Sequence, residues 1–201
     1  MQTVLIALAA YLLGSISFAV LVSRLMGLPD PRSYGSGNPG ATNVLRSGNR
    51  LAAALTLIGD AGKGALAVAL TVFYTGESAI AGLDAPLAGA LAFLGHLYPV
   101  FHGFKGGKGV ATAAGVLLSL SLELGLGTLA TFGIIVFFFR MISLASVISA
   151  VFAVFWVWFL YRLTPITPVV AAIALLLVWR HRDNILRIMR GAEPRLGEKK
   201  T

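Results

Sequence analysis

Cysteine is absent from the 201 residues, and charged side chains are scarce. The absence of cysteine excludes disulfides, thiolate catalysis and thiolate-ligated metals, and leaves the redox compartment open. Asp, Glu, Lys and Arg make up only 12% of the chain. A soluble domain of this length needs a polar surface, and so few charges cannot cover one. A water-soluble globular fold is therefore excluded.

Hydrophobic residues, by contrast, make up 57% of the chain and occur in long runs. Such runs are typical of transmembrane helices. Run 110–139 is interrupted by Glu123, which favours two helices that separate near this residue. We predict an all-α, polytopic membrane helix bundle with about seven transmembrane helices, or about five if 110–139 is one span and another run is misjudged. We expect a single domain over 1–201. The runs are 3–26, 51–75, 85–101, 110–139, 144–161 and 167–179.

The charges are basic in excess, with 16 Lys and Arg against 8 Asp and Glu. In a membrane protein, cytoplasmic loops collect Lys and Arg, so this excess requires no nucleic acid partner. The first apolar run has no preceding cation and reads as a retained helix, not a signal peptide. This pattern predicts an N-terminus outside and a cytoplasmic C-terminus. The predicted cytoplasmic cations are Arg24, Arg32, Arg46, Arg50, Lys105, Lys108, Arg140 and those of tail 180–201, whereas Arg162, Glu77, Asp84 and Glu123 fall outside.

The first polar motif is the loop Gly-Ser-Gly-Asn-Pro-Gly-Ala-Thr-Asn-Val-Leu-Arg at 35–46. Its glycines permit backbone angles that point successive N–H groups in one direction, which makes an anion-binding concavity. Small polar side chains add donors, and an arginine adds a forked cation suited to phosphate. The alternative is an ordinary turn-rich loop. The predicted phosphate ligands are Gly35, Ser36, Gly37, Asn38, Gly40, Thr42, Asn43 and Arg46.

The second motif, 95–109, ends in Phe-Lys-Gly-Gly-Lys-Gly. It resembles a nucleotide-binding P-loop, but only three residues separate Gly103 from Gly107-Lys108, and Gly109 follows where Ser or Thr is required. We therefore exclude ATP binding. The remaining prediction is a glycine-rich loop in which Lys105, Gly106, Gly107 and Lys108 bind substrate. The alternative is contact of the two lysines with lipid headgroups.

Two further polar pairs lie three residues apart on helical segments. His181 and Asn184 share a helix face near the end of the last apolar run, and they are either site residues or helix-capping groups. Asp60 and Lys63 lie inside an apolar run, where each costs about 2.5–3.5 kcal/mol at the bilayer centre. We expect them to pair, in a structural or a catalytic role.

The three histidines, His96, His102 and His181, form no zinc-binding motif, so we predict no metal.

Three motifs in this order resemble the bacterial acyl-phosphate-dependent glycerol-3-phosphate acyltransferases over nearly the whole chain. They are Gly35–Arg46, the run from Gly95-His through Pro99-Val-Phe-His to Lys105-Gly-Gly-Lys-Gly-Val-Ala-Thr112, and His181-Arg-Asp-Asn-Ile185. The resemblance implies transfer of a fatty acyl group from acyl phosphate to glycerol 3-phosphate, giving lysophosphatidic acid and phosphate. This is the first acylation step of phospholipid synthesis.

The resemblance also implies where the parts lie and what they do. The Gly35–Asn43 loop resembles the acyl-phosphate cradle, and Arg46 and Lys105 resemble phosphate ligands. Ser36, Ser143, His181 and Asn184 resemble polar contacts to the substrates, and Glu193 resembles an acidic position of unassigned role. The implied partners are the two substrates and membrane lipid, with no cofactor, in a bacterial inner membrane with the active site facing the cytoplasm. Oligomeric state is left open.

The residues agree with this chemistry, because two anionic reactants require clustered cations and N–H donors to lie together. The His and following Asp of other glycerolipid acyltransferases are absent, since positions 101, 107 and 186 are Phe, Gly and Leu. No serine lies in an evident Ser-His-Asp pattern. We therefore expect no protein nucleophile, with the donor's own phosphate taking the proton or with His181 as the base. The rival classes are an anion transporter and a lipid-binding scaffold.

Overall fold

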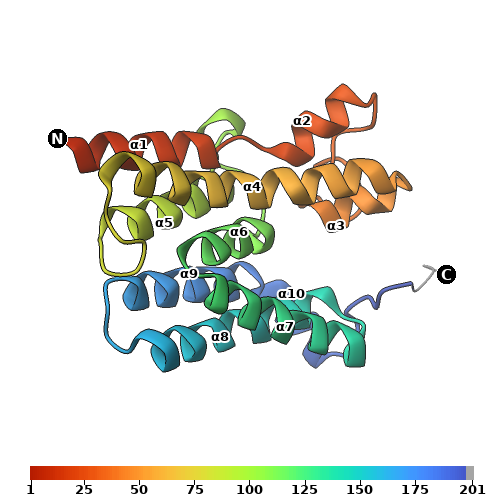
Figure 1. Cartoon of the computed structure of the whole chain (residues 1–201). Helices are drawn as coiled ribbons and strands as arrows, with labels where there is room; N and C mark the ends of the chain where they lie inside the picture. The colour runs from red at the N-terminus through yellow and green to blue at the C-terminus, as the bar shows by residue number, and fades with distance from the viewer. Residues whose placement is uncertain (198–201) are drawn as a thin grey trace.

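A computed structural model describes residues 1–197, which fold into helices joined by loops, without strands (Figure 1). Lys199 and Lys200 of the predicted basic tail lie outside the described residues. The helices are α1 (Gln2–Gly14), α2 (Phe18–Leu25), α3 (Ala41–Val44), η1 (Leu45–Ser47), α4 (Arg50–Thr75), α5 (Asp84–Leu97), η2 (Val100–His102), α6 (Val110–Leu120), α7 (Leu122–Phe139), α8 (Ile142–Tyr161), α9 (Ile166–Arg180) and α10 (Arg182–Met189).

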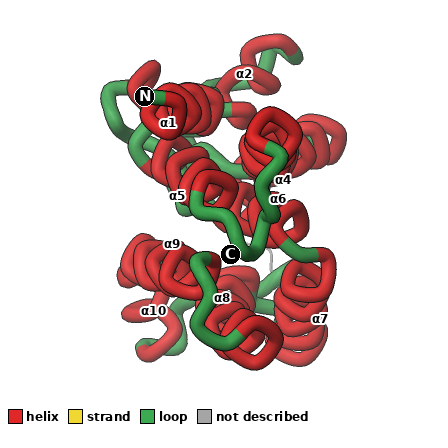
Figure 2. The backbone as a smooth tube through the Cα atoms, turned by 60° about the vertical axis from the view of Figure 1, so that its left-hand side comes forward, coloured by secondary structure: helices red, strands yellow, loops and turns green. Residues whose placement is uncertain are grey.

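The long helices pack in two groups that α6 joins. Helices α1, α4 and α5 pack together, and α7, α8 and α9 form the second group (Figure 2). Helix α6 lies between them and contacts α4 and α7, while α5 also reaches α9. Small residues allow this close approach. Gly14 of α1 lies against the backbone of Ala92, and Gly115 of α6 lies against the carbonyl of Ala61.

The first apolar run, predicted as one helix over 3–26, is broken. Helices α1 and α2 meet at an angle of 44°. At the break, the Ser15 hydroxyl donates to the Tyr11 carbonyl (2.9 Å), and the Lys63 ammonium of α4 donates to the Ile16 carbonyl (2.6 Å). The helix can end here in an apolar setting because the Lys63 side chain binds the Ile16 carbonyl, to which no backbone amide in residues 1–197 donates.

The predicted break within 110–139 is confirmed, at Ser121. The Ser121 hydroxyl accepts the Leu124 amide at the start of α7 (3.1 Å) and lies 2.6 Å from the Tyr161 hydroxyl. Serine is favoured at such N-terminal caps because its oxygen satisfies a free amide.

Three helices, α4, α7 and α8, are long and apolar enough to cross a membrane, and the bent pair α1–α2 makes a fourth if counted as one span. Helices α6 and α9 are apolar but shorter. The count of about seven spans stays a prediction.

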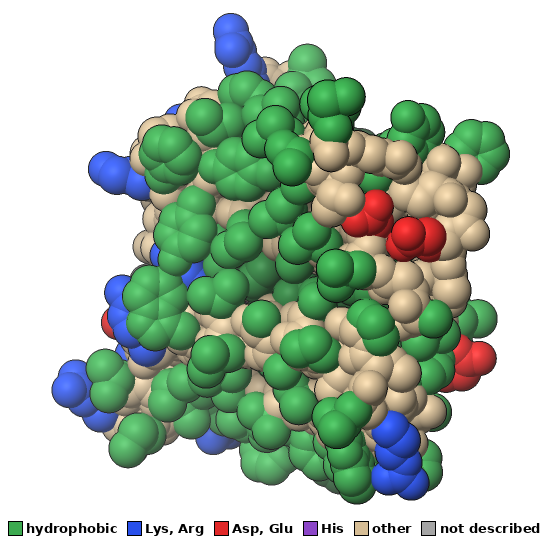
Figure 3. Space-filling model, turned by 90° about the vertical axis from the view of Figure 1, so that its left-hand side faces the viewer, with side chains coloured by type: hydrophobic (Ala, Val, Ile, Leu, Met, Phe, Trp, Pro, Cys, Tyr) green, Lys and Arg blue, Asp and Glu red, His purple; other side chains and the backbone are tan. Residues whose placement is uncertain are grey.

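The lengthwise helices alternate in direction, so the loops collect at two ends of the molecule (Figure 1). One end carries the N-terminus and the loops after α4, α6 and α8. Its surface is largely hydrophobic or uncharged, with few acidic groups and with Lys and Arg mostly along its edges (Figure 3). The opposite end carries the loops 26–49 and 140–141 together with α10, and the segment 98–109 lies between the two ends, beside the break between α1 and α2 (Figure 1). These segments hold most of the three polar motifs.

Candidate functional site

The first motif forms a compact loop organised by Asn43. This side chain is 2% exposed, and its amide donates to the carbonyls of Pro31 (2.6 Å) and Tyr34 (3.1 Å). Its oxygen accepts the Ser36 backbone N–H (2.9 Å). Both amide protons of Asn43 are therefore donated within the protein. Asn43 shapes the loop, whereas the sequence predicts that its side chain donates to a bound phosphate.

Gly35 is required where the loop passes Arg46. It has φ +61°, and a β-carbon there would collide with the Asn43 oxygen and approach the Arg46 side chain to 3.1 Å. Only glycine fits both the left-handed conformation and the space. Arg46 itself is exposed beside the loop, as are Ser36 and Thr42.

The second motif folds back onto the end of α5. The amides of Gly106 and Gly107 donate to the carbonyls of Leu97 and His96 (both 3.1 Å). Arg180, at the end of α9, donates to the carbonyls of Gly106 (3.0 Å) and Gly107 (3.0 and 3.2 Å). These two glycines therefore hold the loop in place through both sides of their peptide groups. Their predicted role in binding substrate stays a prediction.

The two lysines of this loop have different surroundings. Lys105 is exposed, whereas Lys108 is half-buried and donates to the Asn184 oxygen. Burial, and next the nearby Arg187, lower the pKa of Lys108 to about 8. A large fraction of Lys108 is thus neutral just above physiological pH.

The third motif completes a hydrogen-bonded cluster with Glu193. The Asn184 amide donates to one carboxylate oxygen of Glu193 (2.7 Å), and Arg187 donates to the other (2.7 Å). Burial opposes ionisation of Glu193, but the neighbouring Ser143 hydroxyl, Asn184 and Arg187 together hold its pKa below the ordinary value. Glu193 thus fixes the amide of Asn184, which leaves the Asn184 oxygen for Lys108.

His181 lies at the junction of α9 and α10 and is 3% exposed. Its Nδ1 lies 2.8 Å from the Leu177 carbonyl. Burial lowers the pKa of His181 to about 4, although the bond to Leu177 opposes this effect. The ring is therefore neutral at pH 7, with Nδ1–H donated to Leu177 and Nε2 unprotonated.

All three motifs meet around the Gly106–Lys108 segment. A β-carbon on Gly107 would lie 3.1 Å from the Pro39 carbonyl of the first motif. Lys108 contacts Asn184 of the third. Across residues 1–197, Arg46 and Lys105 are exposed and form no hydrogen bond or ion pair. Both cations are thus without a protein partner among the described residues, as are Arg24 and Arg50 outside the motifs.

Sequence reasoning missed Arg180, which links the second and third motifs. The available signal was its position directly before His181, as a cation in the last turn of an apolar helix. The expected pairing of Asp60 and Lys63 is confirmed, at 2.9 Å, with both side chains almost fully buried.

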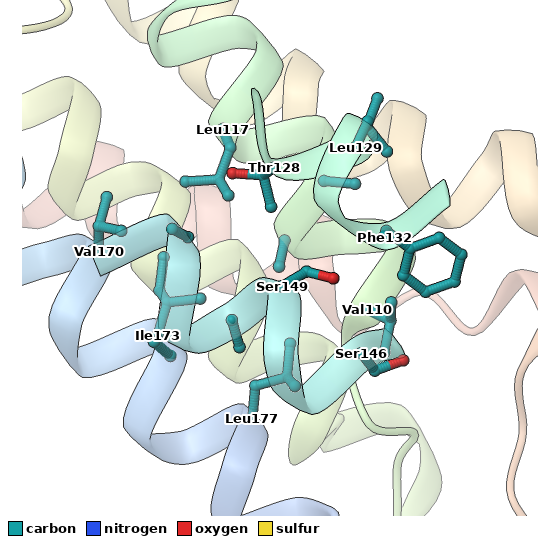
Figure 4. A pocket seen from close by; sticks show the side chains of 15 residues that line it. Val110, Leu117, Thr128, Leu129, Phe132, Ser146, Ser149, Val170, Ile173 and Leu177 are labelled. Carbon is teal, nitrogen blue, oxygen red and sulfur yellow. The ribbon is translucent and has the colours of Figure 1, made fainter. Parts of the chain in front are cut away.

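An apolar groove adjoins the polar cluster (Figure 4). It lies between α6, α7, α8 and α9, is partly open to the outside, and encloses a cavity of about 50 Å³. Val110 is two residues from Lys108, Ser146 is one turn from Ser143, and Leu177 is bonded to His181. One end of the groove therefore reaches the site. No sequence pattern predicts this groove, because its lining comes from four separate helices.

Comparison with known proteins identifies the family, since residues 4–191 match the family described as glycerol-3-phosphate acyltransferase. This chain belongs to the glycerol-3-phosphate acyltransferase family. Two glycerol-3-phosphate acyltransferases illustrate the similarity. That of Ralstonia pickettii is 59% identical over 198 residues, covering 98% of this chain and 96% of the relative. That of Cupriavidus taiwanensis is 56% identical over 200 residues, covering 100% and 99%.

Solved structures of a glycerol-3-phosphate acyltransferase share the fold. The crystal structure of PlsY (YgiH), an integral membrane glycerol 3-phosphate acyltransferase, in its glycerol 3-phosphate form has a TM-score of 0.91 at 36% identity, covering 98% of this chain and 96% of that one. Its lysophosphatidic acid form has a TM-score of 0.89 at 34% identity, with the same coverage. The family resemblance seen in the three motifs is thereby confirmed.

Proposed function

We propose that this protein transfers a fatty acyl group from acyl phosphate to glycerol 3-phosphate. The observation that carries the proposal is the convergence of three polar motifs, with the exposed cations Arg46 and Lys105, beside an apolar groove. A phosphate-bearing headgroup suits the cations, and the apolar lining of the partly open groove suits a fatty chain. Relatives carry the name of a glycerol-3-phosphate acyltransferase, and a structural neighbour is described in glycerol 3-phosphate and lysophosphatidic acid forms.

The groove sets where the acyl carbonyl lies in this proposal. A chain that fills the space between α6 and α9 has its head at the end formed by Val110, Ser146 and Leu177. The Gly35–Asn43 loop, Arg46 and Lys105 then bind the phosphates. Holding two anions together in this way overcomes their repulsion and supplies proximity.

The proton balance favours the donor's phosphate as the base. The glycerol hydroxyl oxygen bonds to the acyl carbon, the bond from that carbon to the phosphate oxygen breaks, and the hydroxyl proton must leave. The departing phosphate becomes strongly basic as this bond breaks and takes the proton itself. His181, with a pKa of about 4, is a weak competitor. The reaction so written needs no protein nucleophile, cofactor or metal.

We place the protein in a bacterial inner membrane, with the N-terminus outside and the motifs at the cytoplasmic face. The support is the positive-inside distribution, since the motif end carries most of the cations.

The test is phosphate release by the purified protein given palmitoyl phosphate and glycerol 3-phosphate, with acyl-CoA in a parallel reaction. We expect release only when both substrates are present, and its collapse in Arg46→Ala and Lys105→Ala. Arg24→Ala is the matched control, because Arg24 is an exposed arginine of α2 outside the three motifs. Folded protein that releases no phosphate from acyl phosphate would refute the proposal and favour an anion transporter.

A further inference from the structure

A buried polar cluster lies beneath the second motif. It consists of Asp60 and Lys63 on α4 and His96 on α5, which are 2%, 2% and 8% exposed. The Asp60 carboxylate lies 2.9 Å from the Lys63 ammonium and 3.4 Å from His96 Nδ1. His96 belongs to the second motif, but the proposed reaction uses none of these three side chains.

Stability alone is a poor reason for such a cluster. Desolvating two charges costs about as much as their attraction returns, and apolar replacements of buried pairs are often neutral or stabilising. Buried ionic groups do fix geometry in some proteins, because each charge must find its partner in one arrangement. The contacts of the cluster therefore indicate its role.

Lys63 connects the cluster to the break in the first span. Its ammonium donates to the Ile16 carbonyl between α1 and α2 (2.6 Å). The adjoining Ser15 hydroxyl accepts the Val100 amide, which begins η2 just before the glycine–lysine loop (3.4 Å). Lys63 therefore stabilises a backbone corner that touches the start of the second motif.

His96 connects the cluster to the loop itself. Its carbonyl accepts the Gly107 amide (3.1 Å), and its ring fills the space that a Gly107 side chain would need. The same position of Gly107 faces the Pro39 carbonyl. The His96 ring thus supports Gly107 at the point where the first and second motifs meet. Asp60 contacts the same ring on the side of its Nδ1 atom.

We propose that Asp60, Lys63 and His96 are positioning residues that fix the Gly106–Lys108 segment against the first motif. This inference rests on the proposed function, because it assigns the cluster to the binding of acyl phosphate. Loss of the contact between His96 and Asp60 should displace the loop, and it should raise the KM for acyl phosphate by a larger factor than it lowers kcat.

The test compares His96→Leu with His96→Asn. Leucine removes the donor toward Asp60, whereas the asparagine amide keeps a donor near the place of Nδ1. We expect His96→Leu to raise the KM for acyl phosphate about 10–100-fold, because small displacements of a bound group have effects of this size. In His96→Asn the KM should stay close to the wild-type value. Ser119→Ala is the control, because it deletes another hydrogen bond to α4, from Ser119 to Ala65, far from the loop in the sequence.

A second measurement is independent of activity. Hydrogen exchange of the Gly106 and Gly107 amides should accelerate in His96→Leu, and stay near the wild-type rate in His96→Asn and Ser119→Ala. If His96→Leu fails to fold, Asp60→Asn replaces it, with the same expected changes. Wild-type exchange and KM in these variants, or equal defects in His96→Leu and His96→Asn, would overturn the positioning role. Absence of acyl transfer in the wild type would refute the proposed function alone, since the exchange result stands by itself.

Discussion

At the scale of single residues, the site contains buried groups that differ in charge: one is neutral and one is ionised. His181 is kept neutral by burial, while the neighbouring carboxyl of Glu193 stays ionised because three groups stabilise its charge. Lys108 lies between these cases, with a pKa of about 8. His181 and Glu193 therefore each have one protonation state at neutral pH. The charge of Lys108, by contrast, changes with small changes of pH.

Lys108 makes substrate binding sensitive to alkaline pH. Its ammonium is charged below about pH 8 and loses its proton as the pH rises through that value. We expect the KM for the phosphate substrates to rise several-fold between pH 7 and pH 9, because a cation is lost. In Lys108→Arg the cation persists, so the rise should disappear. An unchanged pH dependence of the KM in this variant would show that another group titrates.

His181 gives a test of the base. If the donor's phosphate accepts the proton, His181→Ala should lower kcat by disturbing Leu177 and the α9–α10 junction, while the shape of the pH profile between about pH 3 and pH 6, the range that spans the His181 pKa of about 4, stays the same. Steady-state rates across this range measure it. Loss of the pH dependence together with most of the activity would instead assign the base to His181.

At the scale of helices, the apolar groove depends on small side chains of α8. Ala150 and Ala153 face its interior, and larger residues would fill it. We expect Ala153→Leu to lower kcat/KM for palmitoyl phosphate about tenfold, with activity on shorter acyl phosphates retained, since one methylene changes binding by about 10–200-fold in tight pockets. Val151→Leu is the matched control, because Val151 of α8 is 56% exposed and does not line the groove. Equal losses for long and short chains would place the acyl chain elsewhere.

The helices also show what sequence patterns can predict. The break at Ser121 was predictable, because a long run with a polar residue and an N-cap residue marks two helices. The pairing of Asp60 with Lys63 followed from their spacing. The break at Ser15–Ser17 was missed. The Ile16 carbonyl at this break is bound by Lys63, which lies 47 residues away in the sequence. Arg180 and the groove were missed for the same reason, since both depend on contacts between distant segments.

At the scale of the whole molecule, the loops divide between two ends, and their sidedness can be tested directly. The chain has no cysteine, so a single introduced thiol reports its own location. In intact cells, we expect a membrane-impermeant thiol reagent to label Ser78→Cys, in the loop after α4, and to leave Ser33→Cys unlabelled until the cells are opened. The reverse pattern would invert the proposed orientation.

The cluster around Glu193 has a consequence for the timing of biosynthesis. Lys108 and Asn184 are 76 residues apart, and Glu193 follows both. Beyond it, Leu196 pairs with Arg140 through two hydrogen bonds, of 2.7 and 2.8 Å. A ribosome delivers the N-terminal part of a chain first. The helices of a nascent chain can thus enter the membrane before the last link of the site exists, and the finished arrangement arises only after translation has passed Glu193.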